Sequence, residues 1–352
     1  ETDPTLADAP ACVTLEQVDS GTCLVTEELK ARARDRQQLA TAPGGIVQPL
    51  PAPGPAASPA PSLSPSPSTA PPPSPSTAPA TPVPGNATAA LPRPTNTVRP
   101  TPRRAALPQI QRKIAVVIGI DQYADTRIPS LDGARHDADA VANLFSNQLG
   151  YETVLIPDAS REAILRGLNR VALQAGPSDS VIVYYAGHGE LIEKTRLGYW
   201  LPANARVDQP QTWISNNDIG RLMARISASQ VALISDSCFS GSLVGSEALR
   251  TAADADATAL LQRRSAVVMS SGGNEPVADS GKDGHSPFTW NLLRHLEQVS
   301  TWRPGGNVFE QVRQAVMREV PQRPRYGAAL TGRHEAGGDY LFETRGQVDF
   351  TR

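Results

Sequence analysis

The chain has 352 residues, which by length alone suits one to three domains. Its formal net charge of −2 gives no reason to expect nucleic acid or an anionic membrane as a partner. No stretch approaches the roughly 18 apolar residues of a membrane span, and 21 of the 33 prolines lie between Thr41 and Pro108, so about one globular domain follows them.

The N-terminal segment, residues 1–41, carries two of the three cysteines. We expect Cys12 and Cys23 to form a disulfide, with two unrelated free thiols as the alternative. The chain starts at Glu1 without an apolar targeting segment, so we also expect an exported, periplasmic or secreted protein whose signal peptide was removed, although a trimmed chain would look the same. Residues 27–40 are polar and rich in helix formers, which predicts a short solvated helix in a small docking or capping element.

Residues 42–108 are rich in Pro, Ala, Ser and Thr. Proline lacks a backbone donor, and the segment lacks the apolar side chains that a core requires. We therefore expect a disordered, extended linker, which serves either as a spacer from a surface or as a passive connection.

Residues 109–345 alternate apolar strands with amphipathic helices, which predicts an α/β domain with a mostly parallel six-stranded sheet and helices on both faces. The expected strands are residues 114–120, 151–156, 180–185, 231–235, 266–269 and 340–342. The expected helices are residues 134–148, 161–174, 216–226, 287–298 and 308–319. We expect residues 191–215 to be irregular and residues 242–264 to form an exposed loop.

Two of the predicted strands end in chemically reactive residues. Residues 231–241 (VALISDSCFSG) lead from a strand to Cys238, and residues 181–189 (VIVYYAGHG) lead from a strand to His188. The carboxyl ends of parallel strands are where open α/β sheets bind ligands. Each residue alone would be read as structural, but together they predict a cysteine nucleophile with its base. The backbone N–H groups of Gly189 and Cys238 are candidate oxyanion donors.

The segments YYAGHG (184–189) and DSCFSG (236–241) resemble the His and Cys motifs of caspase-like cysteine peptidases, the clan of caspases, paracaspases and metacaspases. Further matches are AVVIGID (115–121), LDGARHD (131–137) and GDYLF (338–342), and the short DSCFSG form is similar to bacterial metacaspase-like proteins, the orthocaspases. The resemblance implies a caspase-like sandwich, protein or peptide substrates, and the catalytic dyad Cys238 and His188.

The resemblance also implies specificity for a basic residue at P1, the substrate residue before the cut bond. Asp236 and Asp137 match acidic pocket residues of metacaspases, and Glu275 resembles a third acid of paracaspases. Such carboxylates would bind a guanidinium through paired hydrogen bonds, which predicts cleavage after Arg, with Lys second.

The chain departs from the metacaspase pattern in two places. Ala134 stands where many metacaspases carry a second cysteine, and the acids after the His motif are scattered rather than grouped. Those acids are Glu190, Glu193, Asp208 and Asp218. Because Ca²⁺ requires several converging oxygen ligands, a calcium requirement is doubtful. The remaining histidines lack metal-ligand spacing, so we expect no zinc site and no cofactor.

In the resembled family, a loop after the nucleophile strand is often cut during maturation. The corresponding residues 242–264 contain Arg250, Arg263 and Arg264, which are candidate sites of self-cleavage, or arginines that merely keep the loop soluble. Two other functions stay open: a catalytically idle caspase-like domain that acts as a tethered scaffold or binding module, and another thiol hydrolase or acyltransferase on an α/β sheet. The sequence makes no prediction about oligomeric state.

Overall fold

The computed structural model describes residues 8–41, 110–249, 256–273, 277–329 and 331–344. The chain divides into two units, one of residues 1–43 with 106–352 and one of residues 44–105, and the described residues all belong to the first. The linker expected over residues 42–108 therefore lies outside the described residues. Within the described part of the chain, no helix has the length and apolar character needed to cross a membrane.

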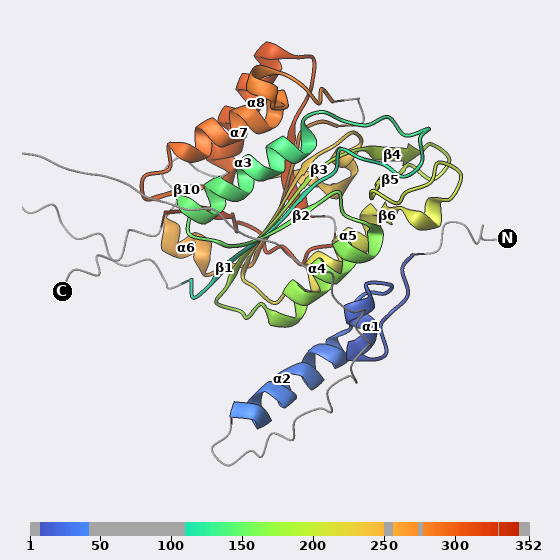
Figure 1. Cartoon of the computed structure of the whole chain (residues 1–352). Helices are drawn as coiled ribbons and strands as arrows, with labels where there is room; N and C mark the ends of the chain where they lie inside the picture. The colour runs from blue at the N-terminus through green and yellow to red at the C-terminus, as the bar shows by residue number, and fades with distance from the viewer. Residues whose placement is uncertain (1–7, 42–109, 250–255, 274–276, 330, 345–352) are drawn as a thin grey trace, which may run out of the picture. The chain divides into compact units, whose positions relative to one another are not determined.

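The domain is built around a seven-stranded sheet with helices on both faces (Figure 1). The first five strands in spatial order run parallel to one another, the sixth runs antiparallel to the fifth, and the seventh runs antiparallel to the sixth. In spatial order the strands are β2 (Glu152–Pro157), β1 (Lys113–Gly119), β3 (Ser180–Ala186), β7 (Gln230–Asp236), β9 (Ser265–Ser270), β11 (Arg325–Ala329) and β8 (Val244–Ala248).

The continuous apolar strands of the sequence lie at the centre of the sheet because both of their faces are covered. Every residue of β1, β3, β7 and β9 is buried. The helices α3 (Ala134–Asn147), α7 (Pro287–Glu297) and α8 (Gly305–Glu319) supply the core on one face. The helices α4 (Arg161–Gln174) and α5 (Asn216–Arg225) supply the core on the other face (Figure 1).

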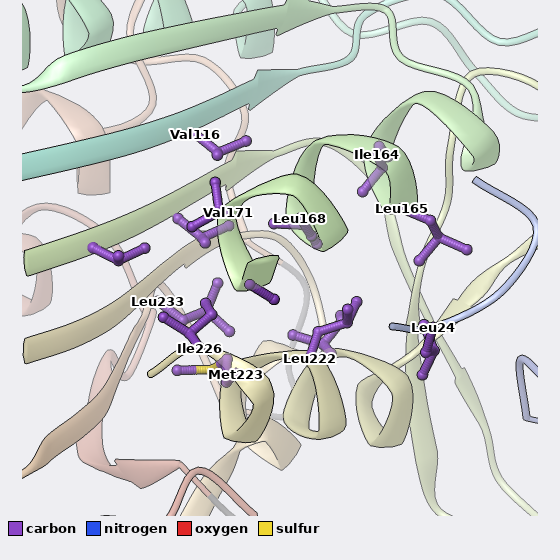
Figure 2. Packing of buried hydrophobic residues seen from close by; sticks show 14 of the residues in the cluster. Leu24, Val116, Ile164, Leu165, Leu168, Val171, Leu222, Met223, Ile226 and Leu233 are labelled. Atoms are coloured by element: carbon purple, nitrogen blue, oxygen red, sulfur yellow. The ribbon is translucent and has the colours of Figure 1, made fainter. Parts of the chain in front are cut away.

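The N-terminal segment packs on the face covered by α4 and α5. It contains α1 (Leu15–Ser20) and α2 (Glu27–Thr41), and a disulfide joins Cys12 to Cys23, the pairing expected from the sequence. Figure 2 shows Leu24 in the same apolar cluster as Leu165 of α4 and Leu222 of α5.

Buried polar contacts fix the same segment to both helices. The Asn169 side chain in α4 accepts from Val25 N at 2.9 Å and donates to Cys23 O at 2.7 Å. Asp218 in α5 accepts from Ala9 N at 3.1 Å. In α2, the helix expected to be solvated, Leu29 and Lys30 are buried, which makes this segment part of the domain core.

The structure differs from the expected sheet at its edges. The main sheet has seven strands instead of six, because it gains two unexpected strands, β8 and β11, and lacks the strand expected at 340–342. Strand β8 comes from the expected loop 242–264, and β11 has too few apolar residues to be recognised. The strand expected at 340–342 instead becomes β12 (Leu341–Glu343), which pairs with β10 (Trp302–Pro304) in a separate two-stranded sheet.

Residues 191–215, expected to be irregular, contribute to a small antiparallel sheet. Its strands are β4 (Gly189–Ile192), β5 (Leu197–Trp200) and β6 (Ile214–Ser215). Strands of two to four residues are too short to show an alternating pattern. A five-residue helix, α6 (Ala257–Leu261), also falls in the expected loop.

Candidate active site

His188 and Cys238 follow neighbouring strands that run in parallel. Strands β3 and β7 pair in register, with Ala186 beside Asp236 at their carboxyl ends. Gly187 N donates to Asp236 O at 3.3 Å, which joins the two strand ends. Each reactive residue stands two positions beyond its strand, so the register of the sheet brings the imidazole and the thiol to the same edge.

The imidazole of His188 is oriented by a backbone carbonyl. Its Nε2 lies 2.9 Å from Pro129 O, and because a carbonyl oxygen only accepts, Nε2 carries the hydrogen. The neutral ring therefore has its lone pair on Nδ1. Tyr123 fixes the same residue from another side, since its hydroxyl accepts from His188 N at 2.8 Å and its ring lies 5.1 Å from the imidazole.

The thiol of Cys238 is partly buried and accepts a hydrogen bond. Val277 N donates to Sγ at 3.3 Å. Burial raises the pKa of the Cys238 thiol. The resting form is therefore the thiol, and nucleophilic attack requires a base.

The backbone of Gly189 passes directly beside the nucleophile. A Cβ placed on Gly189 would lie 2.1 Å from the carbonyl oxygen of Cys238, so only glycine allows this approach. Phe239, the residue after the cysteine, has the left-handed φ of 58°, which is uncommon for a residue with a side chain and turns the chain sharply away from the strand.

One pocket is lined by the predicted catalytic dyad and by two of the acids predicted to bind the P1 side chain. It has a volume of about 220 Å³, and its lining includes Cys238, His188, Asp137 and Asp236. Asp137 comes from α3 and Asp236 from the end of β7. The pocket therefore places two carboxyl groups beside a thiol and an imidazole.

Both carboxyl groups are buried, and both have raised pKa values. Burial, with the neighbouring charge of Asp236, raises the pKa of Asp137 to about 9. Burial likewise raises the pKa of Asp236. The pocket is thus a site where negative charge is unfavourable until a cation enters.

A family model described as the caspase domain matches residues 112–334, which is more than half of the chain. The chain belongs to the caspase domain family. Members of this family are generally cysteine peptidases and act on proteins.

Two solved structures are similar to this caspase domain. Caspase-1 from Spodoptera frugiperda is 16% identical with a TM-score of 0.50, and the match covers 71% of this chain and 98% of that one. Protein GSU0716 from Geobacter sulfurreducens is 15% identical with a TM-score of 0.45, and the match covers 65% of this chain and 99% of that one. No curated protein matches the chain. At these identities the first likeness concerns the fold alone.

The third predicted acid and the candidate cleavage sites either lie apart from the pocket or fall outside the described residues. Glu275 and Arg250 are outside the described residues. Arg263 is exposed and donates to Ala336 O at 2.6 Å. Arg264 donates through Nη2 to Ile226 O at 3.0 Å and through Nη1 to Ala228 O, so its side chain is bound within the domain.

The four scattered acids of the caspase domain do not converge on a common point. Asp208 pairs with Arg127, and Asp218 bonds to the N-terminal segment and to Arg221. Among the residues with a described position, no three or more His, Cys, Asp or Glu side chains are grouped as a metal ion would require. Independence from calcium stays a prediction.

Sequence reasoning missed the residues that fix the pocket from outside the strand ends. They are the carbonyl of Pro129, Tyr123, and the start of α7 with His285, Ser286 and Thr289. Ser-Pro before an apolar run is a signal for a helix start, and Ser286 does cap α7 by accepting from Thr289 N. That signal predicts where the helix begins. It does not predict that the N-terminus of the helix contacts two carboxyl groups from other elements.

Proposed function

We propose that this protein is a cysteine endopeptidase that cleaves on the carboxyl side of Arg, with Lys second, and that it works in the manner of the metacaspase-like proteins of bacteria. One observation carries the proposal: a single pocket is lined by Cys238, His188, Asp137 and Asp236. A scaffold or binding module has no use for a thiol, a base and two buried acids in one cavity.

In this mechanism, Nδ1 of His188 accepts the proton of the Cys238 thiol as the sulfur attacks the substrate carbonyl carbon. The same proton then passes to the leaving amine, and water hydrolyses the acyl-enzyme. The hydrogen bond from Nε2 to Pro129 O supports this role, because it leaves Nδ1 as the accepting nitrogen. The backbone N–H groups of Gly189 and Cys238 would stabilise the oxyanion, and the close approach of Gly189 to Cys238 supports that assignment.

The two buried acids, Asp137 and Asp236, would bind the P1 side chain of the substrate. A guanidinium has donors in a planar fork and can bond to both carboxylates at once, whereas a lysine ammonium is a point charge. Arg should therefore bind better than Lys, and an acidic P1 residue should be repelled. Glu275 belongs to the same proposal as a third acid, and its position is outside the described residues.

The enzyme would also process itself between residues 242 and 264. Arg263 is exposed, which supports its accessibility, whereas the bonds of Arg264 to carbonyl oxygens would have to break before it could enter an active site. Arg250 is the third candidate site.

We also infer that the protein works in an oxidising compartment, exported or periplasmic. The disulfide between Cys12 and Cys23 supports this location, since such bonds persist where thiols are not kept reduced.

The proposal is tested with fluorogenic peptides that carry Arg, Lys or Asp at P1, assayed with and without Ca²⁺. We expect turnover in the order Arg, Lys, Asp, and none by Cys238→Ala. The Asp236→Asn variant should raise KM for Arg peptides by about tenfold or more, because a charged partner of the substrate is lost.

Each result decides between specific alternatives. An absence of wild-type turnover in every buffer would favour the idle scaffold. Faster cleavage after Asp than after Arg would remove the pocket assignment and leave the peptidase assignment intact. A chain that stays a single band, indistinguishable from Cys238→Ala, would argue against self-processing.

A further inference from the structure

One short segment at the start of α7 contacts both pocket acids. Ser286 Oγ and Thr289 Oγ1 donate to Oδ2 of Asp236, the second at 2.8 Å. Ser286 N donates to Oδ2 of Asp137 at 3.2 Å. His285 meets the other oxygen of Asp137, with Nδ1 2.6 Å from Oδ1. Both acids are thus fixed by an element that does not itself carry the catalytic pair.

His285 differs from the serine and the threonine because its ring can gain or lose a proton. The whole residue is 8% exposed, and it contacts the catalytic pocket through Asp137 without lining the pocket itself. On one side it bonds to Asp137 in the pocket of about 220 Å³, and on the other it lines a groove of about 390 Å³ beside α3 and α7. The imidazole therefore connects the pocket acid to a second cavity, the groove beside α3 and α7.

The surroundings of His285 favour an uncharged pair with Asp137. From α3, the ring of His136 stacks on it at 4.2 Å. Burial and that neighbouring histidine lower the pKa of His285, while burial and Asp236 raise the pKa of Asp137. Asp283, on the segment that precedes α7, is the acid that acts against this on His285. Trp290 of α7 adds an uncharged ring at 6.0 Å.

We propose that His285 is a positioning residue that controls the ionisation of Asp137, so that selectivity for a cationic P1 side chain rises with pH. The proposal rests on the function proposed above. When a guanidinium enters, the O–H bond of Asp137 breaks, and the proton joins Nδ1 of His285. The proton on the other ring nitrogen then leaves to water. Asp137 is left as a carboxylate against the substrate cation, and His285 is neutral again.

The test compares two substrates that differ only in charge at P1. Fluorogenic peptides with P1 Arg and with P1 citrulline have nearly the same shape, but only Arg is charged. The ratio of their kcat/KM values cancels the pH dependence of the chemical step, because both substrates use the same dyad. For the wild type we expect this ratio to rise up to about tenfold per pH unit below its midpoint, as one ionisation demands.

Two substitutions separate the proton transfer from simple packing. His285→Asn retains an N–H donor that stabilises the carboxylate, and it should move the midpoint to lower pH. His285→Phe retains the ring but has no polar partner for Asp137, so it should move the midpoint to higher pH and reduce the ratio at pH 7.5 by about tenfold or more. His295→Asn on the same helix is the matched control, since His295 does not line the pocket, and it should leave the ratio profile in place.

The outcomes distinguish this inference from the function on which it rests. Midpoints that stay in place in folded His285→Asn and His285→Phe, or that move in the same direction, would overturn the role of His285 while Arg cleavage stands. No preference for Arg over citrulline in the wild type at any pH would overturn the proposed specificity and this inference together. Thermal unfolding followed by circular dichroism checks that each variant is folded.

Discussion

Asp137 lies in the core beside a second carboxyl group, and this placement has a consequence for stability as well as for binding. Its pKa is raised from the ordinary 3.8 to about 9, so between these pH values the native protein binds a proton that the unfolded chain releases. The free energy of unfolding therefore falls as pH rises through that window. The pocket acid reduces the stability of the domain at the pH where its charge is useful.

We predict that Asp137→Asn raises the melting temperature at pH 8 by at least about 2 °C, with a smaller gain at pH 4, because the amide does not have to take up a proton when the chain folds. The same variant should lose most of its activity on Arg peptides. Thermal unfolding followed by circular dichroism at the two pH values measures the difference. A variant less stable than the wild type at pH 8 would contradict the raised pKa.

At the scale of elements, the central strands could be predicted almost to the residue, and the edge strands could not. Strands β1, β3, β7 and β9 are continuous apolar runs because both faces are covered, and the sequence shows this directly. Strand β8 contains small and polar residues, and only its pairing with β11 defines it. No local pattern contains that information.

The candidate site, like the sheet, could be predicted only in part from the sequence. Asp236 ends a central strand, and Cys238 and His188 follow central strands, so the register of the sheet brings the three together. Asp137 lies on the helix that follows β1. Pro129 and His285 reach the site from a loop and a helix start, through contacts that span 59 and 148 residues of sequence. Such contacts depend on how the elements pack, and the sequence alone does not specify them.

Helix α4 carries Asn169, a fully buried polar residue. Its side chain satisfies one donor and one acceptor of the N-terminal segment. Asn169→Ala leaves both backbone groups buried and unpaired, and we expect it to reduce the free energy of unfolding by about 2 kcal/mol or more.

The neighbouring Arg170→Ala is the control, since among the described residues its side chain forms an exposed ion pair with Asp19 and no other, and its loss should change the stability by less than about 1 kcal/mol. Denaturant unfolding measures both variants, and hydrogen exchange at Val25 N reports whether the segment has loosened. Equal stabilities of the two variants would show that the Asn169 bonds contribute little.

At the scale of the whole molecule, the Cys12–Cys23 disulfide stabilises the segment that covers α4 and α5. It closes a loop across a separation of 11 residues, and loops of this size contribute about 3 kcal/mol by restricting the unfolded chain. We expect the double variant Cys12→Ser and Cys23→Ser to lower the free energy of unfolding by up to that amount. Its hydrogen exchange should quicken first in residues 8–41.

The double variant leaves Cys238 intact, so activity and stability can be measured on the same protein. Wild-type protein in a reducing buffer should reproduce its unfolding curve. Identical curves for the oxidised wild type and the double variant would mean that the disulfide does not stabilise the fold.

Residues 8–41 pack directly on α4 and α5. The contacts that hold them there do not involve the residues that connect the segment to β1. A cut in the chain between residues 41 and 110 would therefore give two polypeptides that stay together as one particle. The protein would run as two bands under reducing, denaturing conditions and as one species in native solution. If the enzyme cut itself there, its N-terminal segment would remain bound to the domain as a small subunit.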